Sequence, residues 1–177
     1  CSKSELMSGI NIALRAVPSK TTLPILESLL ITATEEISIT SNDNDMGINT
    51  VVEGVVTERG KIAVEARLFS DIIRKLPENE IYIQTDHNYK LLIKCEDSVF
   101  YLNGNDPQEF PDLPETGETK KISISEFTLK EMIRQTIFSV ATSDANILMK
   151  GELFSISGDK LKVVSLDSHR ISIRNET

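Results

Sequence analysis

The sequence predicts an α+β protein made of repeated units, in each of which a helix is followed by short antiparallel strands. In three separate segments, apolar residues recur every three or four positions, which is the period of a helix with one buried face. Between these segments lie short runs rich in Ile, Val, Leu, Tyr and Phe that end at turn-forming residues, as short strands do. The pattern at the start of the chain also returns after residue 121, which indicates a duplicated unit.

The repeat is visible residue by residue. The stretch LFSISGDKLKVVSLDSHRISI (153–173) resembles LITATEEISITSNDNDMGI (30–48), with one inserted residue. Upstream, an apolar series recurs at a constant offset of 123 residues, and the matched positions of both segments are Leu6 with Leu129, Ile10 with Ile133, Leu14 with Ile137, Val17 with Val140, Leu30 with Leu153, Ile39 with Val163 and Asp43 with Asp167. Solenoid units run about 20 to 50 residues, so an offset of this length predicts tandem domains.

The first half of the first domain is expected to be a helix and three strands. Residues 4–17 form the helix, which Ser2 or Ser4 caps and Pro18 ends. The expected strands are TTLPILESLLIT (21–32), ISITSN (37–42) and roughly Gly47 to Val56. The helical stripe consists of Leu6, Ile10, Ala13, Leu14 and Val17.

The second half repeats this order. A strand in KIAVEA (61–66) leads into a helix from Ala66 to Leu76, whose stripe is Leu68, Phe69, Ile72, Ile73 and Leu76. Three strands are expected in EIYIQT (80–85), YKLLIKC (89–95) and SVFYLNG (98–104). The proline-rich segment DPQEFPDLPETGETKK (106–121) has no helical period and is expected to be an extended linker.

The second domain is expected to begin with a strand in KISIS (121–125) and a helix from Ser125 to Ala141, followed by the repeated stretch. Domain boundaries are therefore expected at 1–115 and 116–177. The chain starts at Cys1 and stops about half-way through the second copy. We expect a fragment of a longer protein, with a first domain that lacks only its first few residues.

Composition excludes several classes of protein. Hydrophobic residues make up 40% and charged residues 26%, as in ordinary globular domains. No run of 18 apolar residues and no signal-type leader occurs, so a cytoplasmic protein without a membrane segment is expected. Cys1 and Cys95 are too few for a disulfide framework and lack zinc-site spacing, so reduced thiols are expected.

Catalytic and metal motifs have plainer alternatives. Ser165, Asp167 and His169 stand at alternate positions, and strand geometry places such residues about 6.6 Å apart in a row, whereas a hydrolytic triad needs hydrogen-bond contact. A polar strand end is the better interpretation, and His87 is expected in an exposed turn. SNDNDMG (41–47) is rich in oxygen ligands but lacks a calcium-loop register, so Asx turns explain it better. No cofactor or metal is expected.

The distribution of charge is more informative. The net charge of −8 opposes a protein that binds nucleic acid with its whole surface. The charged residues of the three expected helices sum to 0, +1 and 0, which leaves −9 for the rest of the chain. Helices less acidic than their sheets form a face that tolerates anions; alternatively, these charges only solvate the exposed helix surfaces.

Four segments carry a resemblance to a known family: TTLPIL (21–26), ARLFSDIIRKLP (66–77), EFPDLP (109–114) and LDSHR (166–170). With them, essentially the whole chain resembles the bacterial sliding clamp, the β subunit of DNA polymerase III. The resemblance implies the DNA clamp fold, with three domains in each protomer and two helix-plus-sheet halves in each domain. Two protomers would close head to tail into a ring with helices lining the hole.

The resemblance also implies a function and partners. The whole protein would be a non-enzymatic processivity factor that encircles double-stranded DNA without sequence preference and tethers the replicative polymerase. Further partners would be the clamp loader, other proteins with clamp-binding motifs, and a second copy in a homodimer. The alternative is a protein-interaction module that reuses the tandem fold without DNA, and an enzyme comes third.

Site residues follow from the same resemblance. DNA contacts are expected from Lys20, Arg67, Arg74, Ser143 and Asn146. The groove for partner peptides is expected to involve Met149, Leu166, Ser168, His169, Arg170 and Ile171. The ring interface is expected at Ile72, Leu76, Phe100 and Leu102, for which ordinary core is the alternative.

This chain departs from the family pattern in two places. Leu166 and Ser168 stand where the family usually has Thr and Gly, which alters the groove. The loop SDANILMKG (143–151) lacks the usual Arg-Pro, and Asn146 stands where a basic residue is expected, so a weaker DNA contact is predicted there.

Overall fold

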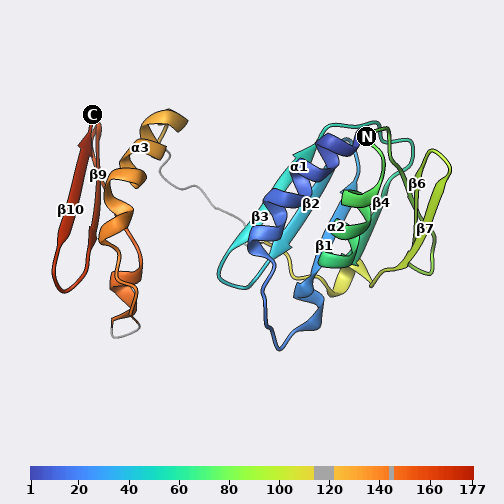
Figure 1. Ribbon diagram of the computed structural model, residues 1–177, viewed down its shortest axis with the longest axis horizontal. Coiled ribbons are helices and arrows are strands. Elements are labelled where there is room, and N and C mark those ends of the chain that lie inside the picture. The colour runs from blue at the N-terminus through green and yellow to red at the C-terminus, as the bar shows by residue number, and fades with distance from the viewer. Residues whose placement is uncertain (114–121, 144–145) are drawn as a thin grey trace. The chain divides into compact units, whose positions relative to one another are not determined.

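A computed structural model describes residues 1–113, 122–143 and 146–177. The chain divides into two compact units, Cys1–Glu115 and Thr116–Thr177. Both combine helices with antiparallel sheets, which confirms the predicted α+β class (Figure 1). None of the helices in these ranges is long and apolar enough to cross a membrane.

The first helix, α1 (Lys3–Ala13), has the predicted cap and buried face. The Glu5 amide donates to Ser2 Oγ at 3.2 Å, which satisfies one of the free amides at the helix start. Leu6, Ile10 and Ala13 are buried. The last predicted turn tightens into a 3₁₀ segment, η1 (Leu14–Ala16), so the helical periodicity continues past the α-helix proper.

Four antiparallel strands form the first sheet, in the order β3-β2-β1-β4. Their bounds are β1 Ser28–Ala33, β2 Ile37–Asn42, β3 Gly47–Val52 and β4 Gly60–Glu65. The predicted first strand began too early: Pro24 starts a 3₁₀ turn, η2 (Pro24–Glu27), because its fixed φ suits the first position of a helical turn. The third strand likewise ends at Val52 rather than Val56.

Helix α2 (Ala66–Lys75) follows β4 directly. Glu65 caps it, accepting hydrogen bonds from the amides of Arg67 at 3.0 Å and Leu68 at 2.6 Å. Phe69 and Ile73 are fully buried, whereas Leu68 is 49% exposed. The predicted stripe was wrong at Leu68, because the buried positions follow Ala66, Phe69, Ser70 and Ile73 and leave residue 68 outside that face.

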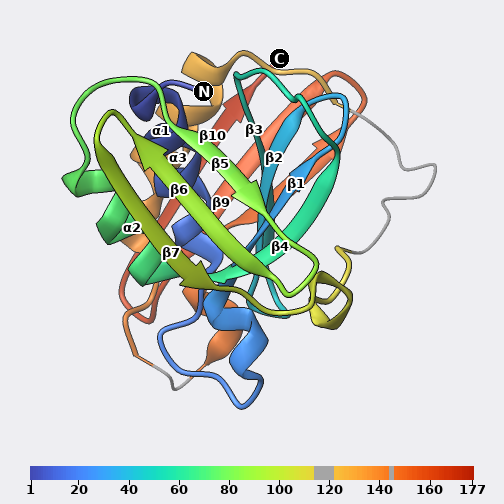
Figure 2. The same cartoon turned by 90° about the vertical axis from the view of Figure 1, so that its right-hand side faces the viewer.

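The second sheet has the order β5-β6-β7, with β5 Tyr82–Thr85, β6 Lys90–Cys95 and β7 Ser98–Asn103. Its inward side chains, among them Leu91, Ile93 and Leu102, join α1, α2 and the first sheet in one hydrophobic core. Figure 1 shows α1 and α2 side by side over the first sheet, and Figure 2 shows β5, β6 and β7 spread across the front of the turned view.

Both ends of this unit are tied to its core. Cys1 and Ile81 exchange backbone hydrogen bonds, at 3.2 Å from Cys1 and 2.8 Å from Ile81. After β7, the Asn105 amide donates to the Ala63 carbonyl at 2.8 Å. A 3₁₀ turn, η3 (Pro107–Glu109), follows, and Phe110 is only 4% exposed. The start of the expected linker therefore packs on the first unit, while its residues 114–121 lie outside the described part.

The second unit contains α3 (Glu126–Thr136), two 3₁₀ segments, η4 (Ile137–Ser139) and η5 (Ile147–Lys150), and a sheet in the order β10-β9-β8. The strands are β8 Leu153–Ser157, β9 Lys160–Leu166 and β10 Ile171–Glu176. Met132, Leu161 and Val163 form its small core. The strand predicted in KISIS is absent from residues 122–125, and Lys121 lies outside the described residues.

The repeat in the sequence is reproduced in the geometry. Ile31 pairs with Ile39 in the first unit, and their counterparts Phe154 and Val163 pair in the second. Ser41 Oγ donates to the Ala13 carbonyl at 2.6 Å, and Ser165 Oγ donates in the same way to the carbonyl of Thr136. Each unit therefore attaches the end of its helix to an inner strand of its sheet through a buried serine.

Candidate functional site

The turn between β9 and β10 contains the LDSHR block. Asp167 Oδ1 accepts hydrogen bonds from the amides of His169 at 2.8 Å and Arg170 at 2.9 Å, and Oδ2 accepts one from Arg170 Nε at 3.0 Å. Ser168, His169 and Arg170 are exposed on this turn. One carboxylate therefore holds the backbone in place and also orients the Arg170 side chain.

The flanks of this turn supply apolar surface. Leu166, at the end of β9, is half-buried, whereas Ile171, which pairs with it from β10, is 60% exposed. Because Asp167 fixes the turn between them, the two aliphatic side chains stand beside the polar residues in a defined order. The turn thus presents both apolar contacts and hydrogen-bonding groups.

The segment around Met149 is tied to the same part of the unit. The Ala141 amide donates to the Met149 carbonyl at 2.8 Å, just after η4. Ser139, at the end of η4, shares a hydrogen bond with Ser172 of β10 at 2.5 Å between hydroxyl oxygens. The half-buried Met149 and the start of β10 are therefore both anchored to η4 or to the residues that follow it.

Asp167 gives a prediction about pH. The hydrogen bond from the His169 amide is the largest cause that lowers the pKa of Asp167 below its ordinary value of 3.8. The side chain and the amide of Arg170 lower this pKa further. A lowered carboxyl pKa contributes stability above pH 3.8 that is lost as the pH falls through the folded-state value. We expect a carbon NMR titration of the Asp167 carboxyl to give a midpoint below 3.8.

The variant Arg170→Gln removes the charge and the side-chain hydrogen bond but keeps both backbone donors. Its Asp167 midpoint should rise and still remain below 3.8, because the His169 amide is the largest cause. Arg174→Gln, on β10, is the control and should leave the midpoint in place. A wild-type midpoint at or above 3.8 would contradict the geometry.

The residues expected at DNA lie on helices and loops. Lys20 is exposed between η1 and η2, and Arg67 is exposed on α2. Arg74, also on α2, contacts Asp71 at 3.1 Å and Ser70 Oγ at 3.2 Å. Both arginines therefore project from one helix of the first unit, but the charge of Arg74 is partly balanced by Asp71.

The other two expected DNA contacts lie in the second unit. Ser143 is exposed, and Asn146 caps η5, its Oδ1 accepting from the Leu148 amide at 3.1 Å. Ile147 and Leu148, which directly precede Met149, are 79% and 85% exposed. These two side chains are not among the predicted site residues, although two consecutive aliphatic residues in a polar loop stand out in the sequence.

The four expected interface residues separate into two kinds. Leu76 and Leu102 are 4% and 9% exposed and belong to the core of the first unit, as the core alternative had it. Phe100 on the edge strand β7 is 39% exposed, and Ile72 is half-buried at the edge of the core. Only Phe100 and part of Ile72 therefore present apolar surface.

The residues of the possible catalytic and metal-binding motifs make hydrogen bonds that support the backbone. Ser165 donates to a helix carbonyl, and Asp167 accepts from the backbone amide of His169, so these residues form no triad. In SNDNDMG, Asp43 Oδ1 accepts from the amides of Asp45 at 3.0 Å and Met46 at 2.6 Å, as expected for an Asx turn. No cluster of three or more potential metal ligands occurs among the described residues.

The two copies of the turn share their backbone hydrogen bonds but differ in backbone conformation at the residue after the aspartate. Asp43 and Asp167 make the same pair of backbone hydrogen bonds. Asn44 adopts a positive φ of 75°, whereas its counterpart Ser168 is not among the described residues with positive φ. Serine therefore fits at position 168 without strain, where the resemblance led us to expect glycine.

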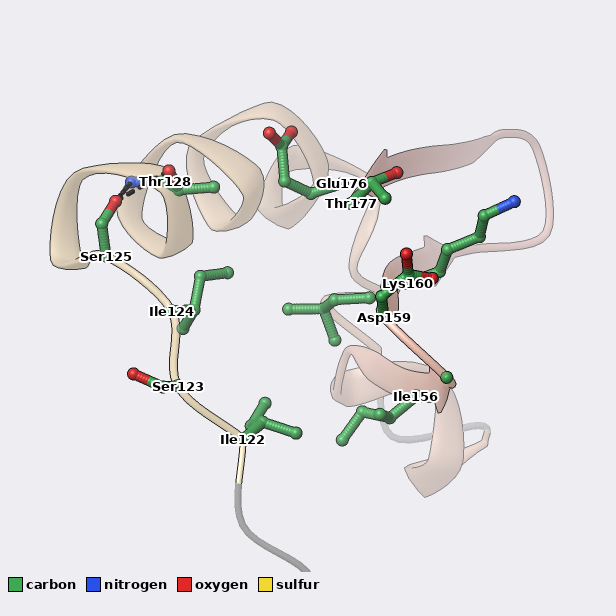
Figure 3. A pocket seen from close by; sticks show the side chains of 12 residues that line it. Ile122, Ser123, Ile124, Ser125, Thr128, Ile156, Asp159, Lys160, Glu176 and Thr177 are labelled. Carbon is green, nitrogen blue, oxygen red and sulfur yellow. Dashed lines mark hydrogen bonds between the residues drawn. The ribbon is translucent and has the colours of Figure 1, made fainter.

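A hollow of about 430 Å³ lies in the second unit, where Ile122 and Ile124 face Ile156 (Figure 3). Cys1 and Ile37 are the first-unit counterparts of Ile124 and Leu161, which also line this hollow. In the first unit, Cys1 and Ile37 line a hollow together with Ile81, just before β5, and Ile83, within β5. The hollow therefore corresponds to a packing face of the fold and does not by itself indicate a small-molecule site.

Comparisons with known proteins cover both units. Residues 1–114 match a family model described as the DNA polymerase III beta subunit, N-terminal domain, and residues 123–177 match the model of the central domain of that subunit. The beta sliding clamp of Halalkalibacterium halodurans is 36% identical over 177 residues, which is 95% of this chain and 47% of the relative. That of Bacillus subtilis strain 168 is 34% identical over 181 residues, 97% of this chain and 48% of the relative.

Solved structures agree. A structure described as a DNA polymerase III beta subunit from Eubacterium rectale is 50% identical with a TM-score of 0.93. The match covers 99% of this chain and 48% of the chain in that structure. The DNA polymerase sliding clamp of Bacillus subtilis is 34% identical with a TM-score of 0.92 at the same coverage. The chain thus spans about half the length of the relatives it matches.

Proposed function

Because the chain belongs to the DNA polymerase III beta subunit family, we propose that the whole protein is a sliding clamp, which encircles duplex DNA and tethers the replicative polymerase. The fold of the chain is the clamp fold of these relatives. The observation that carries the proposal is that the two units match consecutive domains of the same subunit in the same order. We assign the domains to residues 1–115 and 116–177.

The charge distribution supports a ring that slides. A ring retains DNA by topology, so it needs only a mildly basic lining that contacts phosphates without reading bases. Lys20, Arg67 and Arg74 would supply charge to this lining, and Ser143 and Asn146 would add polar contacts. The Arg74–Asp71 contact keeps the charge of α2 moderate, which suits movement along DNA.

The turn held by Asp167 would form part of the peptide groove. We assign to it Met149, Leu166, Ser168, His169, Arg170 and Ile171. Leu166 and Met149, both half-buried, would contribute to the apolar floor, and the exposed Arg170 and His169 would lie at the rim. The occupants would be short segments of the polymerase, the clamp loader and other proteins with clamp-binding motifs.

Ring closure would use β7 of the first unit. Phe100 and Ile72 would contact a second protomer, while Leu76 and Leu102 support them from the core. The whole protein would act as a homodimer in the cytoplasm and would have no catalytic residue, cofactor or metal of its own.

The topological part of the proposal is tested with the whole protein. Loaded onto nicked circular DNA, it should stay bound through gel filtration and be lost after one restriction cut, because a ring slides off a free end. Lys20→Glu should reduce loading more strongly as salt falls, with Glu27→Gln as a charge-changing control. Equal retention on circular and linear DNA would contradict encirclement, and absence from both would favour a protein-interaction module.

A further inference from the structure

The β5-β6-β7 sheet has an outward face that the core does not use. The antiparallel register places Tyr82, Lys94 and Val99 in one cross-strand row. The next row contains Gln84, Leu92 and Tyr101. Lys90 and Asn103 pair beside it. We call these eight residues the tyrosine–lysine face.

Large apolar side chains are exposed on this face. Tyr82 is 50% exposed, Val99 46% and Tyr101 61%, and Leu92 between them is half-buried. Figure 2 shows the three strands of this sheet side by side. Contiguous exposed apolar surface with a polar rim marks interaction sites, and tyrosine is among the residues that contribute most to binding.

The charge of the face contrasts with the charge of the chain. Lys90 and Lys94 are the charged residues of the three strands, which contain no Asp or Glu, although the chain as a whole carries −8. Lys90 Nζ lies 4.7 Å from the centre of the Tyr101 ring, within the range of a cation–π contact. Positive charge is therefore held beside the exposed aromatic surface, although Asp86, directly after β5, offsets part of the charge of Lys90.

These charges distinguish between possible occupants. A second copy of the same face would bring lysines against lysines, which disfavours self-association. Nucleic acid gains its affinity from many phosphate contacts. The net charge of −8 disfavours phosphates that extend past the two lysines of this face. A short acidic protein segment with an aromatic or aliphatic side chain matches both the apolar rows and the lysines.

We propose that the tyrosine–lysine face is a docking surface for an acidic, apolar-containing segment of a partner protein. It belongs to the first unit and shares no residue with the turn held by Asp167 or with α2. The proposal does not depend on the sliding-clamp function. An extended segment of about six residues spans two cross-strand rows and the lysines beside them.

The test titrates the 177-residue chain with a fluorescein-labelled peptide, EDFELDE, by fluorescence anisotropy, with nitrogen–proton NMR spectra to locate the contact. We expect binding that weakens with salt and shifts amide signals of β5, β6 and β7. The double variant Lys90→Glu/Lys94→Glu should weaken binding about tenfold or more. Tyr101→Ser should weaken it as well.

The matched control is Lys75→Glu/Lys130→Glu, which makes the same charge change at exposed helix positions and should leave the affinity unchanged. The peptide EDSESDE, without apolar side chains, should bind more weakly than EDFELDE. No detectable binding, or equal affinity of the two double variants, would overturn the proposal. So would tighter binding of an oligothymidylate, which would assign the face to nucleic acid.

Discussion

Phe69→Ala is expected to be the most damaging single substitution in the first unit. Phe69 is fully buried, and it attaches α2 to the shared core of both sheets. Removing a buried phenyl ring costs about 3–5 kcal/mol, because the transfer free energy is lost and a cavity remains. This is a large part of the total stability of about 5–15 kcal/mol that small domains have.

The measurement is urea unfolding followed by tyrosine fluorescence. All three tyrosines, Tyr82, Tyr89 and Tyr101, lie in the first unit and the chain has no tryptophan, so the signal reports this unit alone. Leu68→Ala is the control, since Leu68 is adjacent but 49% exposed, and it should cost less than about 1 kcal/mol. Equal losses for the two variants would mean that the buried face of α2 is assigned wrongly.

Gly104→Ala should destabilise the same unit because it adds an atom where there is no space, whereas Phe69→Ala leaves a cavity. A Cβ at this position would lie 2.6 Å from Ile62 Cδ1, 2.7 Å from Ile62 Cγ1 and 2.8 Å from the Ala63 carbonyl oxygen. That carbonyl accepts the Asn105 amide and cannot retreat without losing the bond between β4 and the chain after β7. Overpacking of this kind costs about 1–3 kcal/mol.

Gly60→Ala provides the matched control on β4. Its Cβ would meet only Thr85 Cγ2, at 3.7 Å, which is an ordinary contact. We expect little change in the urea midpoint of the tyrosine signal for this variant, or a slight increase. If Gly104→Ala were as stable as Gly60→Ala, the close approach of residue 104 to β4 would be wrong.

Local periodicity predicted the helices and most strands, because burial of one face leaves a regular pattern of apolar residues. Periodicity gave a wrong prediction at Leu68, an apolar residue that borders the buried face of α2. It was also wrong at Pro24, where a 3₁₀ turn begins in a segment predicted to be a strand. KISIS alternates like a strand, yet residues 122–125 join no sheet among the residues described. A strand needs a partner, and alternation alone does not supply one.

The candidate groove could be predicted only in part. The repeat aligns Asp167 with Asp43. The sequence does not show, however, that the Asp167 carboxylate accepts hydrogen bonds from two backbone amides and from the Arg170 side chain. The connection between Met149 and β10 runs through η4, and it depends on contacts between residues far apart in the chain. For Leu76 and Leu102, apolar character fitted both core and interface, and it is the burial of their side chains in the structure that places them in the core of the first unit.

The paired Asx turns have a consequence for how such a protein can diversify. In both copies a single aspartate oxygen holds the backbone, while the side chains of the next residues, Asn44 and Asp45 or Ser168 and His169, stay exposed. Mutations at Asp45, Ser168 and His169 leave the supporting bonds intact, whereas the positive φ of Asn44 restricts which residues fit at that position. Duplication therefore gave one protein two versions of the same loop, in which new surface chemistry can evolve at little cost to folding.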